Sequence, residues 1–214
     1  MTEHKTHLWV QRNICGSPAE ARDRYISRLL YAKSSDKHCV EDSGPFKLFC
    51  DDFRPQNILV DPKTLRIKAV LDLEFTNAMP RQFASDAPWW LLLVGPDSYL
   101  LRDRALGEFV EAYEPRLEHF LQVMERVEGA RDGGAGGAQP LSRLMRESWD
   151  TRRFWFNYAA RKPFDVEVFF DEFLNESNAG IGSLDEDARE GLESFVEMKM
   201  KQLRAYDDEC SRAL

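Results

Sequence analysis

The strongest constraint on the fold is a change of pattern partway along the chain. Near its start, three short apolar runs alternate with polar and turn-forming residues, which is typical of short strands. These runs are Phe46–Cys50, Ile58–Val60 and Ile67–Leu71, and a turn beginning at Asp61-Pro62 separates the last two. From Ala87 onward the apolar spacing becomes helical. The sequence therefore predicts an α+β fold with a few strands and a mostly helical body.

The helices are placed by capping residues and helix breakers. Ser17 as N-cap, Pro18 and Glu20 predict a helix that runs to about Lys33. A loop is expected after it, over Ser34–Pro45. Further helices are expected over Trp89–Val94, Tyr99–Val127 with a kink or split at Pro115, Leu141–Ala160, Val166–Asn175 and Asp185–Cys210. The glycine-rich segment Gly129–Gln139 predicts a flexible insertion.

The composition narrows the range of partners. The chain has 214 residues, 29 of them basic and 37 acidic, and a formal charge of −8. An acidic surface repels phosphate backbones, so we expect no nucleic-acid partner. No apolar run approaches the roughly 20 residues of a membrane span, and the four cysteines lack metal-ligand spacing. We therefore expect a reduced, cytoplasmic protein with no membrane partner.

Polar side chains are expected to gather where the second and third apolar runs meet as a hairpin. If these runs pair symmetrically about their turn, Ile58 lies opposite Leu71. Asn57 then lies beside Asp72 at the open end of the hairpin, with roughly 5 Å between their Cα atoms. An amide oxygen next to a carboxylate is a suitable pair of ligands for Mg²⁺. Asp52 lies at the head of the loop that enters the hairpin, where it can face the same point.

A carboxylate beside such a metal pair is suited to phosphoryl transfer. The metal would neutralise charge on the phosphates, while Asp52 would accept a hydrogen bond from the attacking hydroxyl. Arg54 is placed to contact the transferring phosphoryl group, and a surface salt bridge is its alternative role. A structural interpretation also exists, because Asp52 and Asn57 belong to residue types that favour turns.

These residues resemble the motifs of small-molecule kinases of the aminoglycoside phosphotransferase and choline kinase type. That family shows H-G-D-x-x-x-x-N, then a hairpin, then D-x-E. The resemblance places Asp52 on the catalytic Asp, Asn57 and Asp72 on the metal-binding residues, and Glu74 on the Glu that follows, as a further metal ligand. It implies that Mg²⁺ and ATP are cofactors and that the γ-phosphate of ATP passes to a hydroxyl of a small-molecule substrate.

The resemblance extends over most of the chain, from about His7 to Phe173. The segments DDFRPQNILVD, AVLDLEF, PWWLLL and FWFNYAARK are similar to a fungal-type branch of the family. It implies a protein-kinase-like C-lobe over residues 17–180, interrupted by the insertion at 129–139. Residues 1–16 would form an N-terminal segment and residues 181–214 a C-terminal helix.

Two departures from the family pattern limit what the resemblance implies. Cys50 replaces the His of the motif, which organises the loop. In addition, no strand with a glycine-rich turn and no matching Lys precede Phe46, so the lobe that grips ATP is expected to be absent. A non-catalytic, pseudokinase-like module is therefore the alternative, with a second copy or another protein bound over the exposed inter-lobe face. A truncated chain and a family member repurposed for proton transfer are further alternatives.

Overall fold

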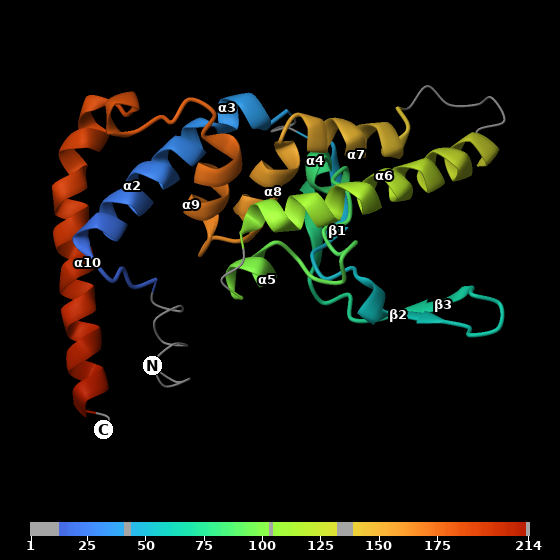
Figure 1. Cartoon of the computed structure of the whole chain (residues 1–214), viewed down its shortest axis with the longest axis horizontal. Coiled ribbons are helices and arrows are strands. Elements are labelled where there is room, and N and C mark those ends of the chain that lie inside the picture. The colour runs from blue at the N-terminus through green and yellow to red at the C-terminus, as the bar shows by residue number, and fades with distance from the viewer. Residues whose placement is uncertain (1–12, 41–43, 103–104, 132–138, 213–214) are drawn as a thin grey trace. The chain divides into compact units, whose positions relative to one another are not determined.

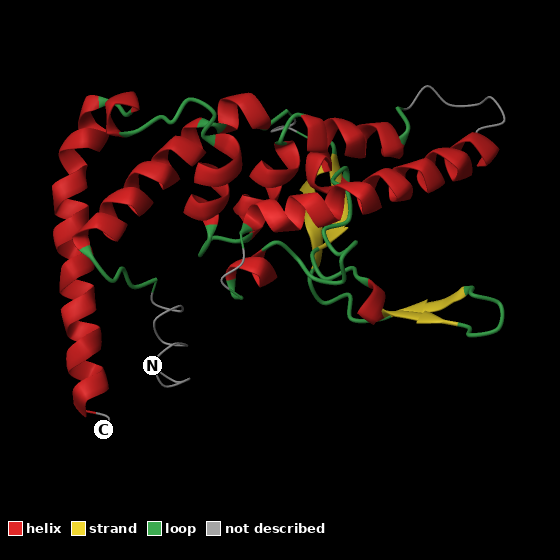
Figure 2. Ribbon diagram, viewed as in Figure 1, coloured by secondary structure: helices red, strands yellow, loops and turns green. Residues whose placement is uncertain are grey.

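The computed structural model describes residues 13–40, 44–102, 105–131 and 139–212. They form two compact units, which are described separately. The terminal unit comprises Met1–His38 and Tyr158–Leu214, and the central unit comprises Cys39–Asn157. The architecture is α+β, with many helices and two small antiparallel sheets (Figure 2). The predicted fold class is confirmed at this level. None of the described helices combines the length and the apolar character needed to cross a membrane.

The terminal unit is built on two long helices. Its elements are α2 (Pro18–Lys33), α3 (Ser35–His38), α9 (Val166–Phe169), the π-helical η2 (Phe170–Leu174), the 3₁₀ turn η3 (Ile181–Ser183) and α10 (Glu186–Arg212). Helix α2 packs against both α9 and α10 (Figure 1). Ser17 caps α2 by accepting a hydrogen bond from the Glu20 amide at 3.1 Å, as predicted. Helix α3 lies in the segment expected to be a loop, so that expectation is wrong there.

The segment that leads into α2 is anchored by apolar packing. Ile14 and Cys15 are both buried, Cys15 among Leu192 and Val196 of α10. The buried Lys199 donates a hydrogen bond from Nζ to the Asn13 carbonyl at 3.1 Å, which satisfies its charge in part. The residues just before α2 thus belong to the core of the terminal unit.

The central unit contains both sheets. Its elements are β1 (Phe46–Cys50), η1 (Pro55–Asn57), β2 (Ile58–Val60), β3 (Ile67–Val70), β4 (Thr76–Pro80), α4 (Arg81–Ala84), α5 (Asp97–Leu100), α6 (Leu106–Arg131), α7 (Leu141–Asp150) and the start of α8 (Arg153–Arg161), which crosses into the terminal unit. Strand β1 pairs with β4, and β2 pairs with β3 as a hairpin that projects from the rest of the unit (Figure 1). The three predicted strands are confirmed, whereas β4 was not expected.

Several helix predictions need correction. The expected helix over Trp89–Val94 is a series of turns, because prolines flank it and Leu93 adopts a left-handed conformation with φ 63°. The long helix begins only at Leu106 but runs through Pro115 without a split. A similar left-handed residue, Arg152 at φ 62°, separates α7 from α8. Part of the expected insertion, residues 129–131, is the end of α6, and residues 132–138 lie outside the described chain.

The core of the central unit is an aromatic cluster between α6, α7 and α8. Phe109 stacks on Tyr113 with ring centroids 5.0 Å apart. Tyr113 contacts Trp149 at 4.9 Å, and Phe154 meets Trp155 edge to face at 5.1 Å. Large aromatic rings bury much apolar area in such contacts. Trp149 and Trp155 are therefore part of this core cluster.

The strands, in contrast, carry many exposed apolar side chains. Leu48 on β1 is 80% exposed, and the group also includes Phe46, Leu59, Val60, Leu65, Ile67, Leu71, Leu73 and Phe75. A sheet normally buries one face against a core. Within the described part of the central unit, these faces are left uncovered.

Candidate functional site

The candidate site begins in the tight loop that joins β1 to β2. The Phe53 amide donates to the Cys50 carbonyl at 3.3 Å, and the Asn57 amide donates to the Arg54 carbonyl at 2.9 Å. The indole Nε1 of Trp89 donates to the Asp51 carbonyl at 3.3 Å. The loop is therefore folded back on itself and held from a distant segment of the central unit.

Asp52 and Asn57 are joined directly. Asn57 Nδ2 lies 2.9 Å from Asp52 Oδ2 and 2.9 Å from the Asp52 carbonyl, and donates to both. These two bonds use both amide protons, which points the Oδ1 atom of Asn57 away from Asp52. The amide oxygen therefore remains available as a ligand or acceptor.

Arg54 forms an ion pair with the same carboxylate. Its Nε lies 2.8 Å from Asp52 Oδ1, but the N–H does not point at that oxygen, so Nε is left without a hydrogen bond. The Asp52 side chain is 24% exposed and that of Arg54 is 38% exposed. The arginine therefore leaves the carboxylate open to solvent. Asp52, Arg54 and Asn57 form one connected group, which we call the loop triad.

The predicted hairpin register is wrong by one residue. Ile58 pairs with Val70, not with Leu71, and the Leu71 amide donates to the Asn57 carbonyl at 2.8 Å. The hairpin closes with Val60 opposite Ile67, two residues away from the predicted register, and an irregularity between Leu59 and Val60 restores one of these two residues. It accompanies a four-residue loop in which Asp61 accepts hydrogen bonds from two loop amides.

Asp72 consequently lies one residue past the pair formed by Asn57 and Leu71. It is exposed and adopts a left-handed conformation with φ 57°, which Asp tolerates better than most residues. Glu74 is exposed as well. The structure gives neither carboxylate a hydrogen bond to the loop triad. It therefore connects Asp52, Arg54 and Asn57 with each other, and places Asp72 and Glu74 further along the same hairpin end.

The side chains present fit a Mg²⁺ site in ligand type. Asn57 Oδ1 and the exposed Asp72 carboxylate are hard oxygen donors, and Mg²⁺ is commonly held by one or two protein oxygens together with water and substrate phosphates. Within the described ranges, no cluster of three His, Cys, Asp or Glu side chains is positioned to hold a metal. A metal here would therefore depend on phosphate oxygens to complete its coordination.

A buried polar network that the sequence did not predict joins α4, α7 and α8 in the central unit. Asn157 is fully buried and donates from Nδ2 to both carboxylate oxygens of Asp86 at 3.0 Å. It accepts from Gln82 Nε2 at 2.6 Å, and Ser148 donates to Asp86. Burial, together with the charge of Asp86, raises the pKa of Tyr113 well above its usual value. The sequence gives no local signal for this network, because its residues lie far apart along the chain.

Cys50 stands where the kinase motif that this chain resembles has His. Cys50 pairs with Thr76 across β1 and β4, and the buried Thr76 Oγ1 has no hydrogen-bond partner. A buried hydroxyl without a partner is costly. The pair is therefore a local weak point next to the loop triad.

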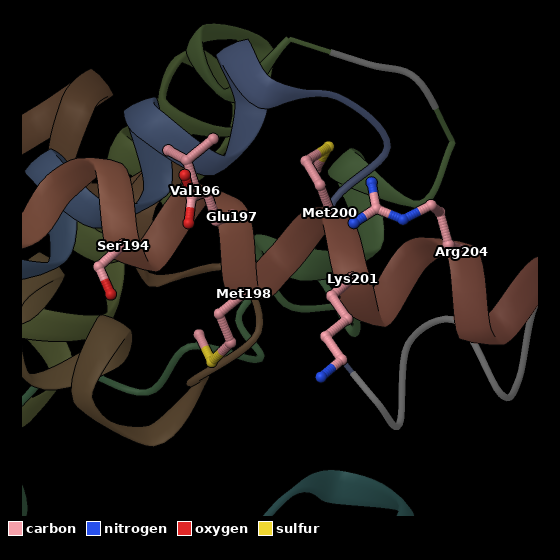
Figure 3. A pocket seen from close by; sticks show the side chains of 7 residues that line it. All are labelled: Ser194, Val196, Glu197, Met198, Met200, Lys201 and Arg204. Carbon is pink, nitrogen blue, oxygen red and sulfur yellow. The ribbon is translucent and has the colours of Figure 1, made fainter.

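A recess on the surface of the terminal unit provides no comparable site. It lies along α10, and the labelled side chains in Figure 3, among them Met198, Lys201 and Arg204, come from that helix alone and point to different sides of it. A binding site requires polar side chains that converge on one point, and these side chains do not.

Comparison with known proteins found no relationship for this chain. No protein-family model matches it, no curated protein matches it, and no solved structure matches it. Its function is therefore inferred from the geometry of the chain itself and from the resemblance of its motifs.

Proposed function

We propose that the chain is a phosphotransferase of the aminoglycoside phosphotransferase and choline kinase type, with the central unit as its C-lobe. The observation that carries the proposal is the loop triad, in which Asn57 fixes the carboxylate of Asp52 by two hydrogen bonds of 2.9 Å. This arrangement leaves the Asn57 amide oxygen available as a ligand, and the exposed Asp72 carboxylate lies at the same end of the hairpin.

In this proposal Asp52 orients the acceptor. Its carboxylate accepts a hydrogen bond from the hydroxyl of a small-molecule substrate and takes the proton as the new O–P bond forms. The bond between the γ-phosphorus and its bridging oxygen breaks, and ADP leaves. Arg54 can turn from Asp52 toward the phosphoryl group because its Nε forms no hydrogen bond to that carboxylate.

Asn57 and Asp72, with Glu74 as a further candidate, would hold Mg²⁺. Bound there, the ion would neutralise charge on the β- and γ-phosphates of ATP. The groups that cover those phosphates in kinases have no counterpart among the described residues. Positioning supplies much of the rate in this chemistry, so we expect the chain alone to be a slow catalyst.

Calorimetric titration with Mg²⁺ and a non-hydrolysable ATP analogue tests the proposal. Wild type and the control Glu111→Ala, an exposed carboxylate on α6, should bind, whereas Asp72→Ala should bind at least tenfold more weakly. Asp52→Asn should keep binding but lose phosphotransfer by about 100-fold or more. Equal binding by Asp72→Ala and wild type, or full transfer by Asp52→Asn, would disprove it.

A non-catalytic binding module is the second candidate, and the exposed strands favour it. Phe46 and Leu48 lie on one face of β1 and have most of their area in water. Exposed apolar side chains of this kind are typical of a surface that binds a second copy or a protein partner. Sedimentation velocity should then show association that Leu48→Ser weakens and the control Leu101→Ser, also highly exposed, does not. A chain that stays monomeric at every concentration and captures no nucleotide would count against both candidates.

A further inference from the structure

The β2–β3 hairpin carries an unusual combination of side chains at its far end. Leu65 is 78% exposed and Ile67 is 64% exposed, and both lie at or beside the loop that closes the hairpin. Figure 1 shows this end pointing away from the helices of the central unit. Exposed leucine and isoleucine at the tip of a projecting hairpin are costly in water.

Leucine is an unusual residue for the backbone conformation found at position 65. Its φ is 56°, in the left-handed region where glycine or asparagine is normally found. A bulky side chain in this conformation is rare and is a reason to look for a function. The tip therefore keeps an apolar side chain where the backbone favours a small one.

Basic residues flank these apolar side chains in the sequence. Between Ile58 and Val70 the chain has three basic residues and one acidic residue, a formal charge of +2 in a protein of charge −8. Lys68 pairs with Asp61 at 2.8 Å, while Lys63 and Arg66 are exposed and have no ionic partner among the described residues. The tip is thus locally basic, and Asp72 and Glu74 make its base acidic.

Apolar exposure is present on both faces of the hairpin. Leu59 and Val60 are neighbours in one strand and so point to opposite faces, yet each is about half exposed, at 50% and 46%. A protein groove would cover one face of such a hairpin. A lipid interface surrounds whatever enters it, so a two-sided apolar tip ringed by cations fits a lipid interface better.

We propose that the β2–β3 hairpin is a peripheral membrane-docking element that inserts Leu65 and Ile67 among the headgroups of an anionic bilayer, with Lys63 and Arg66 on its lipid phosphates. The acidic base of the hairpin is repelled by the same surface, so the tip enters first. This proposal does not depend on phosphotransfer. It replaces the expectation of no membrane partner, which was based on the absence of an apolar run long enough to span a membrane.

Co-sedimentation with lipid vesicles tests this proposal. Wild type should bind vesicles that contain phosphatidylserine, and not vesicles of phosphatidylcholine alone, and high salt should release it. Each cation near the surface contributes roughly fivefold to binding, so Lys63→Glu with Arg66→Glu should reduce it by at least about tenfold. Leu65→Ser with Ile67→Ser should reduce it similarly, and Leu101→Ser should leave it unchanged.

The two double variants separate docking from misfolding. The charge variant changes only exposed side chains, so its far-ultraviolet circular dichroism should match wild type even if the apolar variant loses structure. Equal binding to both vesicle types, no binding to either, or unchanged binding by the charge variant would overturn the proposal. An acidic protein partner would be indicated if the hairpin bound such a protein but no vesicle.

Discussion

Asn157 links two other polar side chains in the interior of the central unit. It is fully buried, donates to Asp86 and accepts from Gln82, which is also buried. Buried polar groups are tolerated because they are paired, and leaving one unpaired costs more than the bond itself contributes.

Replacing Asn157 by Ala should therefore destabilise the protein substantially. Both Asp86 and Gln82 would lose a partner, and we expect a loss of about 2–4 kcal/mol in the free energy of unfolding. Urea denaturation monitored by circular dichroism measures this loss in the free energy of unfolding. The exposed Asn77→Ala serves as control and should change stability by less than about 0.5 kcal/mol. A loss no larger than that of the control would show that the network contributes little.

Asp61 gives a prediction in pH. The side chain of Lys68, with two loop amides, lowers the pKa of the Asp61 carboxyl from 3.8 to about 2. Because the folded pKa is depressed, the stabilisation is complete above pH 3.8 and is lost as the pH falls through about 2. Carboxyl-carbon NMR should find the midpoint near that value, and Lys68→Ala should move it upward. A midpoint at the ordinary aspartate value in wild type would contradict the ion pair.

At this scale, the sequence was informative about residue types and less so about their partners. Asp52 was expected to face the same point as Asn57, and the two side chains are joined by a hydrogen bond. Arg54 forms an ion pair with Asp52 within the same loop. Asp86 and Asn157 lie far apart in sequence, and only the packed helices bring them together.

The elements were predictable where a local signal was strong. The N-terminus of α2 is an example, since Ser17 and Glu20 satisfy amides within four residues of themselves. Strand β4 was missed because Thr76–Pro80 has little apolar alternation and is held by pairing with β1. The hairpin register was missed because the loop closes with Asp61 bonded to Arg66, which displaces the strands by two residues from the expected pairing, and the bulge beside Leu59 recovers only one.

Ser17→Ala should destabilise the protein by about 1 kcal/mol, because loss of the cap leaves an amide of the first turn unpaired. The matched control is Ser194→Ala, at an exposed position of α10, which should have almost no effect. Thermal unfolding of both variants makes the comparison. Equal melting temperatures for Ser17→Ala and wild type would show that the first turn of α2 does not need this cap.

For the whole molecule, the four cysteines report on the two units separately. None of them forms a disulfide. Cys15 and Cys210 are buried in the terminal unit, and burial raises the pKa of the Cys15 thiol. Cys39, in the central unit, is exposed, and Cys50 is partly exposed.

Thiol labelling in native buffer should therefore modify Cys39 first and Cys50 more slowly. Cys15 and Cys210 should react only when the terminal unit unfolds, and should do so together as urea is increased. Mass spectrometry of labelled peptides assigns each site. Rapid labelling of Cys15 in the native protein would contradict the packing of the segment before α2.

The π-helical segment η2 has a consequence for how this chain tolerates change in length. The Asn175 amide donates to the Phe170 carbonyl at 2.9 Å, five residues back, so the turn holds one residue more than an α-helix would. Deleting a residue there would restore regular winding but rotate the residues after the deletion by about 100°. Leu174, now buried, would swing toward solvent. The surplus residue is thus what aims this leucine inward, and homologous chains should keep the spacing more strictly than the side chains.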